Sequence, residues 1–164
     1  MQSIIIEEAW KDLSRSFEWS ENTLEKFQDQ VDWDEISESI YFHWTIPMVQ
    51  KFQKRINWNR FSKNISENTL TEKMLETFKE KWDWHELSCN YRININDSML
   101  EKYADRWDWE CIINRHSHDQ YRDRGMDFYE KYKEYIPITK LARTCLWREM
   151  INQQMNHLIN EING

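Results

Sequence analysis

The stretch Trp82-Asp83-Trp84-His85-Glu86-Leu87-Ser88-Cys89-Asn90 has the pattern of a short helix with both ends marked. Asp83 stands at the N-cap position, and Glu86 follows at the spacing of a capping box. Trp82 and Leu87 have the positions of a hydrophobic staple, and Asn90 marks the C-terminal end. A helix of about two turns is unstable alone. We therefore predict that packing against neighbouring segments holds it.

Variants of this stretch recur along the chain. Its tryptophan is repeated at separations of 23, 25, 26 and 25 residues, as Trp10, Trp33, Trp58, Trp84 and Trp109. The last four copies have a capping residue directly before the tryptophan: Asp32, Asn57, Asp83 and Asp108. An aliphatic and an aromatic residue stand nine and six positions upstream, at helical spacing. Each repeat is therefore predicted to be a longer helix, a tight turn and a short helix that begins at the tryptophan.

This period of about 25 residues predicts an all-α fold of stacked short helical repeats, because one unit cannot bury its tryptophan alone. The length of 164 residues fits a single helical-repeat domain over 1–164. Within it we expect an N-terminal cap at 1–16, four repeats at 17–115 and a C-terminal helical cap at 116–164. In the first cap, Ile6, Trp10 and Leu13 should face inward.

The C-terminal cap is predicted to contain the longest helix, residues 138–162. Its apolar residues keep a spacing of three and four: Leu141, Cys145, Trp147 or Arg148, Ile151, Met155, Leu158 and Ile162. The aligned tryptophans are expected in the core. Those outside the repeat register are expected to be exposed, namely Trp19, Trp44 and Trp147.

The repeated pattern Leu-x-x-Phe followed by Trp-Asp-Trp-x-x-Leu-Ser-x-Asn resembles a family of short repeats found in uncharacterised bacterial, phage and large-virus proteins. The resemblance covers about residues 7–115, and the best copies are 75–90 and 100–112. The copy at Trp109 departs from the pattern after Ile112, so the repeats are predicted to end there. The resemblance implies a helical scaffold, with no known activity or catalytic residue.

Several classes of chemistry have no support in the sequence. The two glycines, Gly125 and Gly164, are too few for a glycine-rich phosphate cradle, and neither G-x-S-x-G nor H-E-x-x-H occurs. His116, His118 and Asp119 suggest a metal cluster, but histidines two apart do not share a helix face and no second cluster supplies ligands. We predict no enzyme, no cofactor, no metal site and no small-molecule substrate.

The cysteines Cys89, Cys111 and Cys145 are odd in number and include no C-x-x-C pair, which indicates reduced thiols in a cytoplasmic protein. The apolar start at Ile4–Ile6 is too short for a secretory signal. No run approaches the ~20 apolar residues of a membrane helix, so no membrane partner is expected.

The negative charge is concentrated near the start of the chain. Residues 1–50 hold 3 basic and 11 acidic groups, whereas the rest of the chain is close to balanced. The acids form helically spaced rows, and these are the candidate partner-binding residues: Glu21, Glu25, Asp29, Asp34 and Glu38. The plainer interpretation is a solvated face that the fold tolerates. The functional one is an acidic surface for a basic partner.

These observations predict a non-enzymatic protein-binding helical repeat. The chain has few Ala and Gly and many Asn, Ile and Lys, and this composition fits a phage or mobile-element product. Its concrete form would be an inhibitor of a nucleic-acid-handling effector, such as an anti-CRISPR that occupies the basic channel of a CRISPR nuclease. One alternative is a structural scaffold or adaptor. Another is an RNA-binding repeat that uses basic C-terminal residues: Arg115, Arg122, Arg124, Lys131, Lys133 and Lys140.

Overall fold

The computed structural model describes residues 2–115 and 125–163. This part contains twelve α-helices and no strand, which confirms the predicted all-α class of stacked short helices. The chain divides into two compact units, unit 1 (residues 1–96) and unit 2 (residues 97–164). The single domain over 1–164 stays a prediction. Within the described residues, no helix combines the length and apolar character needed to cross a membrane.

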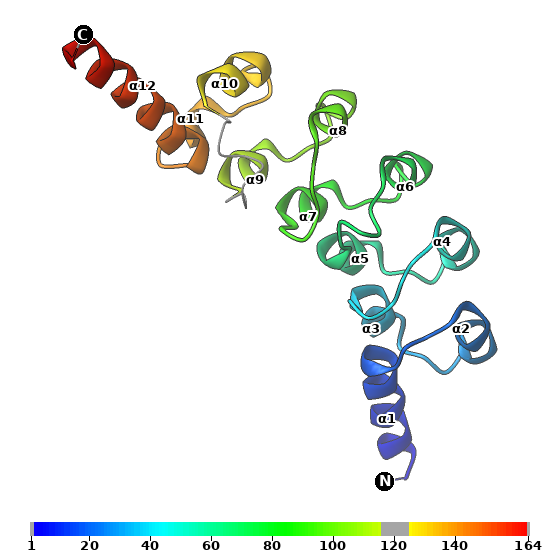
Figure 1. Ribbon diagram of the computed structural model, residues 1–164. Coiled ribbons are helices and arrows are strands. Elements are labelled where there is room, and N and C mark those ends of the chain that lie inside the picture. The colour runs from blue at the N-terminus through cyan, green and yellow to red at the C-terminus, as the bar shows by residue number, and fades with distance from the viewer. Residues whose placement is uncertain (1, 116–124, 164) are drawn as a thin grey trace. The chain divides into compact units, whose positions relative to one another are not determined.

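Unit 1 consists of α1 (Gln2–Ser16) and three helix pairs that stack on it. The pairs are α2 (Glu21–Phe27) with α3 (Trp33–Glu38), α4 (Ile46–Phe52) with α5 (Trp58–Asn64), and α6 (Glu72–Thr77) with α7 (Trp84–Cys89). Figure 1 shows the first helices of the pairs in one row, and α1, α3, α5 and α7 in the other. Contacts run from α1 to α3, from α3 to α5 and from α5 to α7. The predicted tryptophan-led helices therefore form the spine of unit 1.

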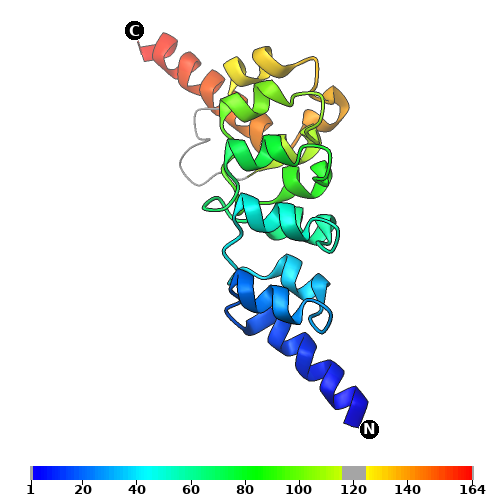
Figure 2. The ribbon, with the colours of Figure 1, turned by 90° about the vertical axis from the view of Figure 1, so that its right-hand side faces the viewer.

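Unit 2 contains five helices: α8 (Asp97–Lys102), α9 (Trp109–Asn114), α10 (Met126–Tyr132), α11 (Ile138–Leu141) and α12 (Cys145–Asn163). α9 contacts α11 and α12, and α10 contacts α12. Figure 2 shows blue α1 extending past the rest of unit 1 and red α12 extending past the rest of unit 2. Each unit thus has one terminal helix that projects from its own helix pairs.

One turn geometry joins the two helices of every pair. Between α4 and α5, the carbonyl of Phe52 accepts the N–H groups of Arg55 at 2.8 Å and Ile56 at 3.1 Å. The same pair of hydrogen bonds forms at four other carbonyls, those of Phe27, Phe78, Tyr103 and Tyr132. The last of these joins α10 to α11, beyond the predicted end of the repeats. There Ile138 takes the tryptophan position and Pro137 the cap position, so the turn persists where the sequence motif does not.

The repeated tryptophan makes a hydrogen bond that no other apolar residue can make. Nε1 of Trp58 donates to the carbonyl of Gln53, five residues earlier, at 3.1 Å. Trp33, Trp84 and Trp109 make the same bond, to the carbonyls of Gln28, Lys79 and Ala104. These carbonyls lie at the ends of the first helices, where backbone acceptors lack intrahelical partners. The indole therefore packs in the turn and also satisfies the end of the preceding helix.

In unit 1, a buried serine links each tryptophan-led helix to the preceding element of the stack. Ser37 donates to the carbonyl of Trp33 at 2.6 Å and accepts the backbone N–H of Asn57, the N-cap of α5, at 2.9 Å. Ser14 accepts the N–H of Asp32 at 2.8 Å in the same way. Each of these serines is at most 2% exposed. The cap of one pair is thus completed by the hydroxyl of the preceding pair.

This link changes the capping box predicted at Asp83. In a complete box, the N–H of Asp83 would bond to the side chain of Glu86. In the structure that N–H donates to Ser62 at 3.0 Å. The other half of the box is present, because the Asp83 side chain accepts the N–H of Glu86 at 3.1 Å. The local motif was identified correctly, but one of its two bonds comes from the neighbouring repeat.

Two tryptophans outside the register are buried, so their predicted exposure is wrong. Trp19 and Trp44 are 8% and 6% exposed, whereas Trp147 is 40% exposed as predicted. Trp19 directly precedes the N-cap Ser20, and Trp44 directly precedes the N-cap Thr45. A residue before an N-cap packs as a hydrophobic staple. These two tryptophans therefore anchor the starts of α2 and α4.

The predicted helix over 138–162 is divided in two, which corrects the sequence-based boundary. Arg143 has a φ of 74°, in the left-handed region, and separates α11 from α12. The Thr144 side chain accepts the N–H of Trp147 at 3.1 Å and so caps the start of α12. A non-glycine residue in this conformation carries a local cost, which is offset here by the buried threonine cap.

The serine link predicts a large difference between two similar substitutions. Ser37→Ala removes the acceptor for the N–H of Asn57 and should lower the free energy of unfolding by about 1–3 kcal/mol, the cost of an unsatisfied buried group. Ser16→Ala is the matched control, because Ser16 makes the same bond to a carbonyl four residues earlier but is exposed. It should change stability by less than about 0.5 kcal/mol. Urea denaturation measures both, and equal effects would contradict the link.

The tryptophan bond predicts a stabilising substitution. Ile138 stands at the tryptophan position of the α10–α11 pair and is 70% exposed. Ile138→Trp should let the indole donate to the carbonyl of Lys133 and raise the free energy of unfolding by about 0.5–1.5 kcal/mol. Tyr91→Trp, at another position that is 70% exposed, is the control and should give no such gain. A loss of stability in Ile138→Trp would show that this pair does not share the repeat geometry.

Candidate functional site

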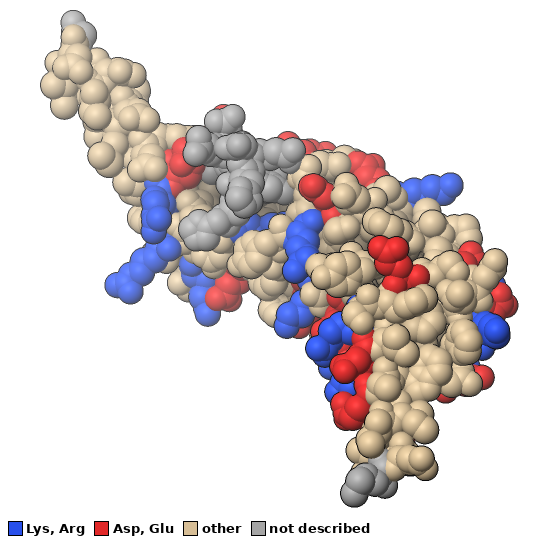
Figure 3. Space-filling view, turned by 60° about the horizontal axis from the view of Figure 1, so that its bottom comes forward, with Lys and Arg blue, Asp and Glu red and all other residues tan. Residues whose placement is uncertain are grey.

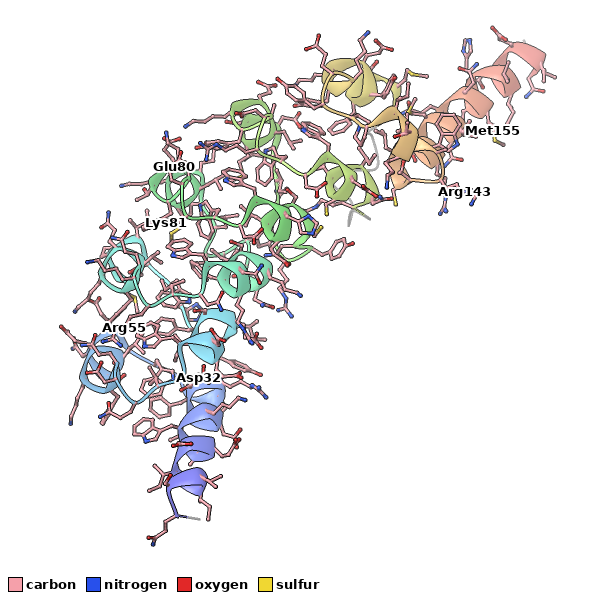
Figure 4. The ribbon with its side chains drawn as sticks, turned by 180° about the vertical axis from the view of Figure 1, so that it is seen from behind. Asp32, Arg55, Glu80, Lys81, Arg143 and Met155 are labelled. Carbon is pink, nitrogen blue, oxygen red and sulfur yellow. The ribbon has the colours of Figure 1, made fainter. Side chains whose placement is uncertain are left out.

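The first acidic row lies on α2 and in the turn after it, where cations of the next pair cross it. Lys51 bridges Glu21 at 3.1 Å and Glu25 at 2.6 Å. Arg55 pairs with Asp29 at 2.6 Å, and Figure 4 shows Arg55 between the α2 and α4 helices. The hydrogen bonds that Lys51 donates to Glu25 and Glu21 raise its pKa. The like charges that would repel one another on an isolated α2 are therefore bridged in the stack.

The second acidic group lies on α3, in the other row of unit 1. Arg60 of α5 contacts Glu38 at 2.5 Å and Asp34 at 3.5 Å. Asn57 adds a hydrogen bond to Asp34 at 2.7 Å. The hydrogen bond to Glu38 is the main cause that raises the pKa of Arg60. These two acids thus help to join α3 to α5.

A further carboxylate, Glu35, is buried, and no sequence pattern predicts it. Glu35 is 4% exposed and accepts two bonds from Arg15, at 2.7 Å from Nε and 3.0 Å from Nη2. This bidentate geometry is the strong form of a charge-assisted pair. The bond from Arg15 is the main cause that lowers the pKa of Glu35, against the opposing effect of burial. The equivalent positions in the next repeats are Arg60 and Glu86, so the periodicity does not mark this site.

The five predicted partner-binding residues therefore do not form one continuous acidic surface. They divide into a group on α2 and a group on α3, and each group is crossed by cations of the following pair. Figure 3 shows acidic and basic side chains side by side on the visible face of unit 1. Exposed ion pairs of this kind contribute roughly 0–1 kcal/mol each. Their clearest role in the structure is to join successive repeats.

Of the alternative basic site, the structure describes Arg115 and the three lysines. Arg115 is 8% exposed. The three lysines are paired with carboxylates: Lys131 with Glu101 at 2.5 Å, Lys133 with Glu130 at 2.8 Å, and Lys140 with Glu110 at 3.4 Å. Arg122 and Arg124 lie outside the described residues, as do His116, His118 and Asp119. Cys145 is a reduced thiol, as predicted, whereas the prediction of reduced thiols is wrong for Cys89 and Cys111, which are disulfide-bonded.

Two hollows in unit 1 involve polar side chains. An open one of about 440 Å³ is lined by Glu38, Asn59, Arg60, Lys63 and Asn64. A smaller one of about 20 Å³ lies beside Trp44, whose Nε1 is buried without a hydrogen-bond partner among the described residues. The smaller volume suits a single water molecule. The larger hollow is open, and the Glu38–Arg60 pair occupies its wall.

Exposed apolar side chains concentrate on the two terminal helices. Of the seventeen large apolar side chains that are exposed in the described part, eleven lie on α1, directly after it at Phe17, or on α12. The first group is Ile4, Ile5, Ile6, Leu13 and Phe17, and the second is Trp147, Ile151, Met155, Leu158, Ile159 and Ile162. Clustered exposed apolar side chains mark interaction sites.

The prediction that Ile6, Trp10 and Leu13 face inward is wrong for Ile6 and Leu13, and the apolar spacing over 138–162 does not mark the buried face of α12. In α12 the buried apolar residues are Leu146 and Met150, not the stripe of which Met155 and Leu158 form part. In α1, Ile6 and Leu13 are 57% and 44% exposed, and only Trp10 is half-buried. Helical spacing identifies a stripe on α12 but does not show which of two stripes meets the rest of the unit. The stack covers one side of α1, through the contact between α1 and α3.

No family model matches the chain, and comparisons with curated proteins and with solved structures found no match. The resemblance to a family of short helical repeats stays a prediction.

The Arg15–Glu35 pair predicts a pH-dependent stability. Because the folded-state pKa of Glu35 is lowered, the pair stabilises the protein at neutral pH. This contribution is lost as the pH falls below the ordinary pKa of a glutamate and then through the lowered pKa of Glu35. Glu35→Gln should therefore be less stable at pH 7 and lose less stability on acidification than the wild type. Urea denaturation from pH 7 to pH 3 measures this, with exposed Glu18→Gln as the control for the lost charge. Parallel pH curves for wild type and Glu35→Gln would contradict it.

Proposed function

We propose that the chain is a non-enzymatic protein-interaction module, in which stacked helical repeats hold two apolar terminal helices available for a partner protein. The observation that carries this proposal is the concentration of exposed apolar side chains on α1 and α12. Burial of apolar surface gives about 25 cal/mol per Å², so these faces offer a partner far more binding energy than the paired charges of α2 and α3.

The use of the buried polar groups supports a scaffold role. Ser14, Ser37 and Ser62 connect successive pairs, and the Asn90 side chain donates to the carbonyls of Ser62 and Ile65 at 3.0 and 2.8 Å. Thr144 caps α12, and Glu35 is held by Arg15. These groups satisfy backbone or ionic partners within the fold. None of these contacts leaves a reactive group directed at a substrate.

The more specific form predicted from the sequence is an inhibitor of a nucleic-acid-handling machine in the cytoplasm, acting through Glu21, Glu25, Asp29, Asp34 and Glu38. It stays a prediction. The structural scaffold or adaptor is a variant of the same proposal, in which the terminal helices join the chain to a larger assembly.

Capture of a partner from a lysate of the source organism tests the proposal. Tagged protein is incubated with untreated and with nuclease-treated lysate, and bound proteins are identified by mass spectrometry. Wild type should retain a specific protein, and Ile5→Asp or Leu158→Asp should reduce its recovery at least about tenfold, which corresponds to about 1.4 kcal/mol of binding. Asn156→Asp is the matched control on α12 and should leave recovery unchanged.

Other outcomes separate the alternatives. If recovery falls in Glu21→Gln/Glu25→Gln but not in the two helix variants, binding depends on the acidic row and the proposed surfaces are wrong. If the bound material is lost after nuclease treatment, the RNA-binding alternative is favoured, and binding should then weaken steeply with salt.

A further inference from the structure

We infer that the outer face of α12 is a self-association surface, and that its occupant is α12 of a second copy of this chain. This inference rests on the proposed interaction function and assigns a partner to one of its two surfaces. The surface is the α12 stripe, which we define as Ile151, Met155, Leu158 and Ile162. All four side chains are exposed, from 43% at Ile151 to 82% at Ile162.

The α12 stripe points away from the rest of unit 2. At about 100° per residue, its four members lie within about 60° of one another around the helix axis. The buried residues Leu146 and Met150 lie on another side, as does Gln153, whose side chain accepts the N–H of Met126 at 3.0 Å. Every residue from 151 to 163 is exposed. This segment therefore extends beyond the contacts that hold the start of α12.

The spacing of the α12 stripe is that of a helix–helix seam. The intervals of four, three and four residues average about 3.7, close to the 3.6 residues of a helical turn, which keeps the apolar side chains facing a partner helix along the segment. An isolated helix of about thirteen residues is marginal in water. A partner helix on this face would stabilise the extension by burying the stripe.

The charge of the extension selects the partner. In a chain that is 31% charged, residues 151–163 contain one acidic residue, Glu161, which pairs with His157 at 3.2 Å. Figure 3 shows the projecting end of α12 at the upper left almost free of acidic and basic side chains. Its other polar residues are Asn and Gln. A charged partner surface would lose water against this face without gaining an ion pair.

A second α12 meets these requirements better than α1 does. It presents the same apolar stripe flanked by the same uncharged amides, so no ionised group becomes unpaired. α1 carries Glu7, Glu8, Lys11, Asp12 and Arg15 within fifteen residues. Contact of the same surface on two copies is the isologous arrangement of two-fold dimers.

An antiparallel arrangement of the two helices follows from the rest of the chain. The intervals of the α12 stripe read the same in both directions, so Met155 of one copy faces Leu158 of the other. Each chain has a net charge of −7, and the body of unit 2 adjoins the start of α12. Antiparallel packing places the two bodies at opposite ends of the helix pair and so limits their repulsion. Figure 4 shows Met155 on the projecting part of α12.

Sedimentation velocity of the purified full chain tests the inference. Such a helix pair is smaller than the ~1,200 Å² of a stable standard interface. We therefore expect a weak monomer–dimer equilibrium, visible between about 1 µM and about 1 mM. Met155→Glu/Leu158→Glu should weaken dimerisation at least about tenfold. Asn156→Glu/Asn160→Glu adds the same two charges on the opposite side of the helix and should leave the equilibrium close to that of wild type.

Circular dichroism and thermal unfolding of each variant show that the fold is intact. A monomer at all concentrations would overturn the inference, while lysate capture that depends on α12 would leave the proposed function standing. Dimerisation that survives Met155→Glu/Leu158→Glu but is lost in Ile5→Asp would also overturn it, because α1 would then be the self-association surface.

Discussion

The hydrogen bond from the N-cap N–H of each tryptophan-led helix, α3, α5 and α7, to a serine of the preceding element is the constraint on which unit 1 depends. A helix of six or seven residues cannot persist alone, and the first backbone donors of a helix have no partner within it. Ser14, Ser37 and Ser62 supply that partner from the preceding pair. Since Ser14 and Ser37 also donate backward, to the carbonyls of Trp10 and Trp33, the position of one helix fixes the next. Secondary structure and stacking therefore form together, as expected where each repeat contacts only its neighbours.

The same dependence explains why the ends of the stack differ from its middle. The residue three positions after the repeated tryptophan is at most 1% exposed at Ile36 and Phe61, yet the equivalent Leu13 of α1 is 44% exposed. Ion pairs follow the same logic: Lys51 and Arg60 each connect their own pair to the preceding one. In a middle repeat, the apolar and charged groups therefore contact the neighbouring repeats. In α1, which packs on α3, part of the apolar surface stays exposed.

Much of the fold could be predicted from the sequence, because the signals involved are local. The tryptophan period, the caps Asp32, Asn57 and Asp83, and the apolar core positions all depend on spacing within one repeat. The errors arose at residues whose type fits more than one environment in the fold. Trp19 and Trp44 stand outside the period but before a cap, α12 has two apolar stripes, and the acids of α2 and α3 face cations 20 or more residues away. The α10–α11 pair was missed because Ile138 and Pro137 stand in place of the motif. A backbone turn without the motif residues leaves no recognisable sequence pattern.

The two kinds of surface differ in what they can contribute to binding. The acidic rows are exposed and paired, and a partner cation would have to displace Lys51, Arg55 or Arg60, so the net gain is small. Their removal would also loosen the contact between repeats. The α12 stripe makes no such contribution to its own unit, and its apolar surface is exposed in the free chain. Burial there is favourable without the loss of an existing contact. The serines and ion pairs of unit 1 hold its repeats together, whereas the proposed binding surfaces lie on helices that the repeats position but leave exposed.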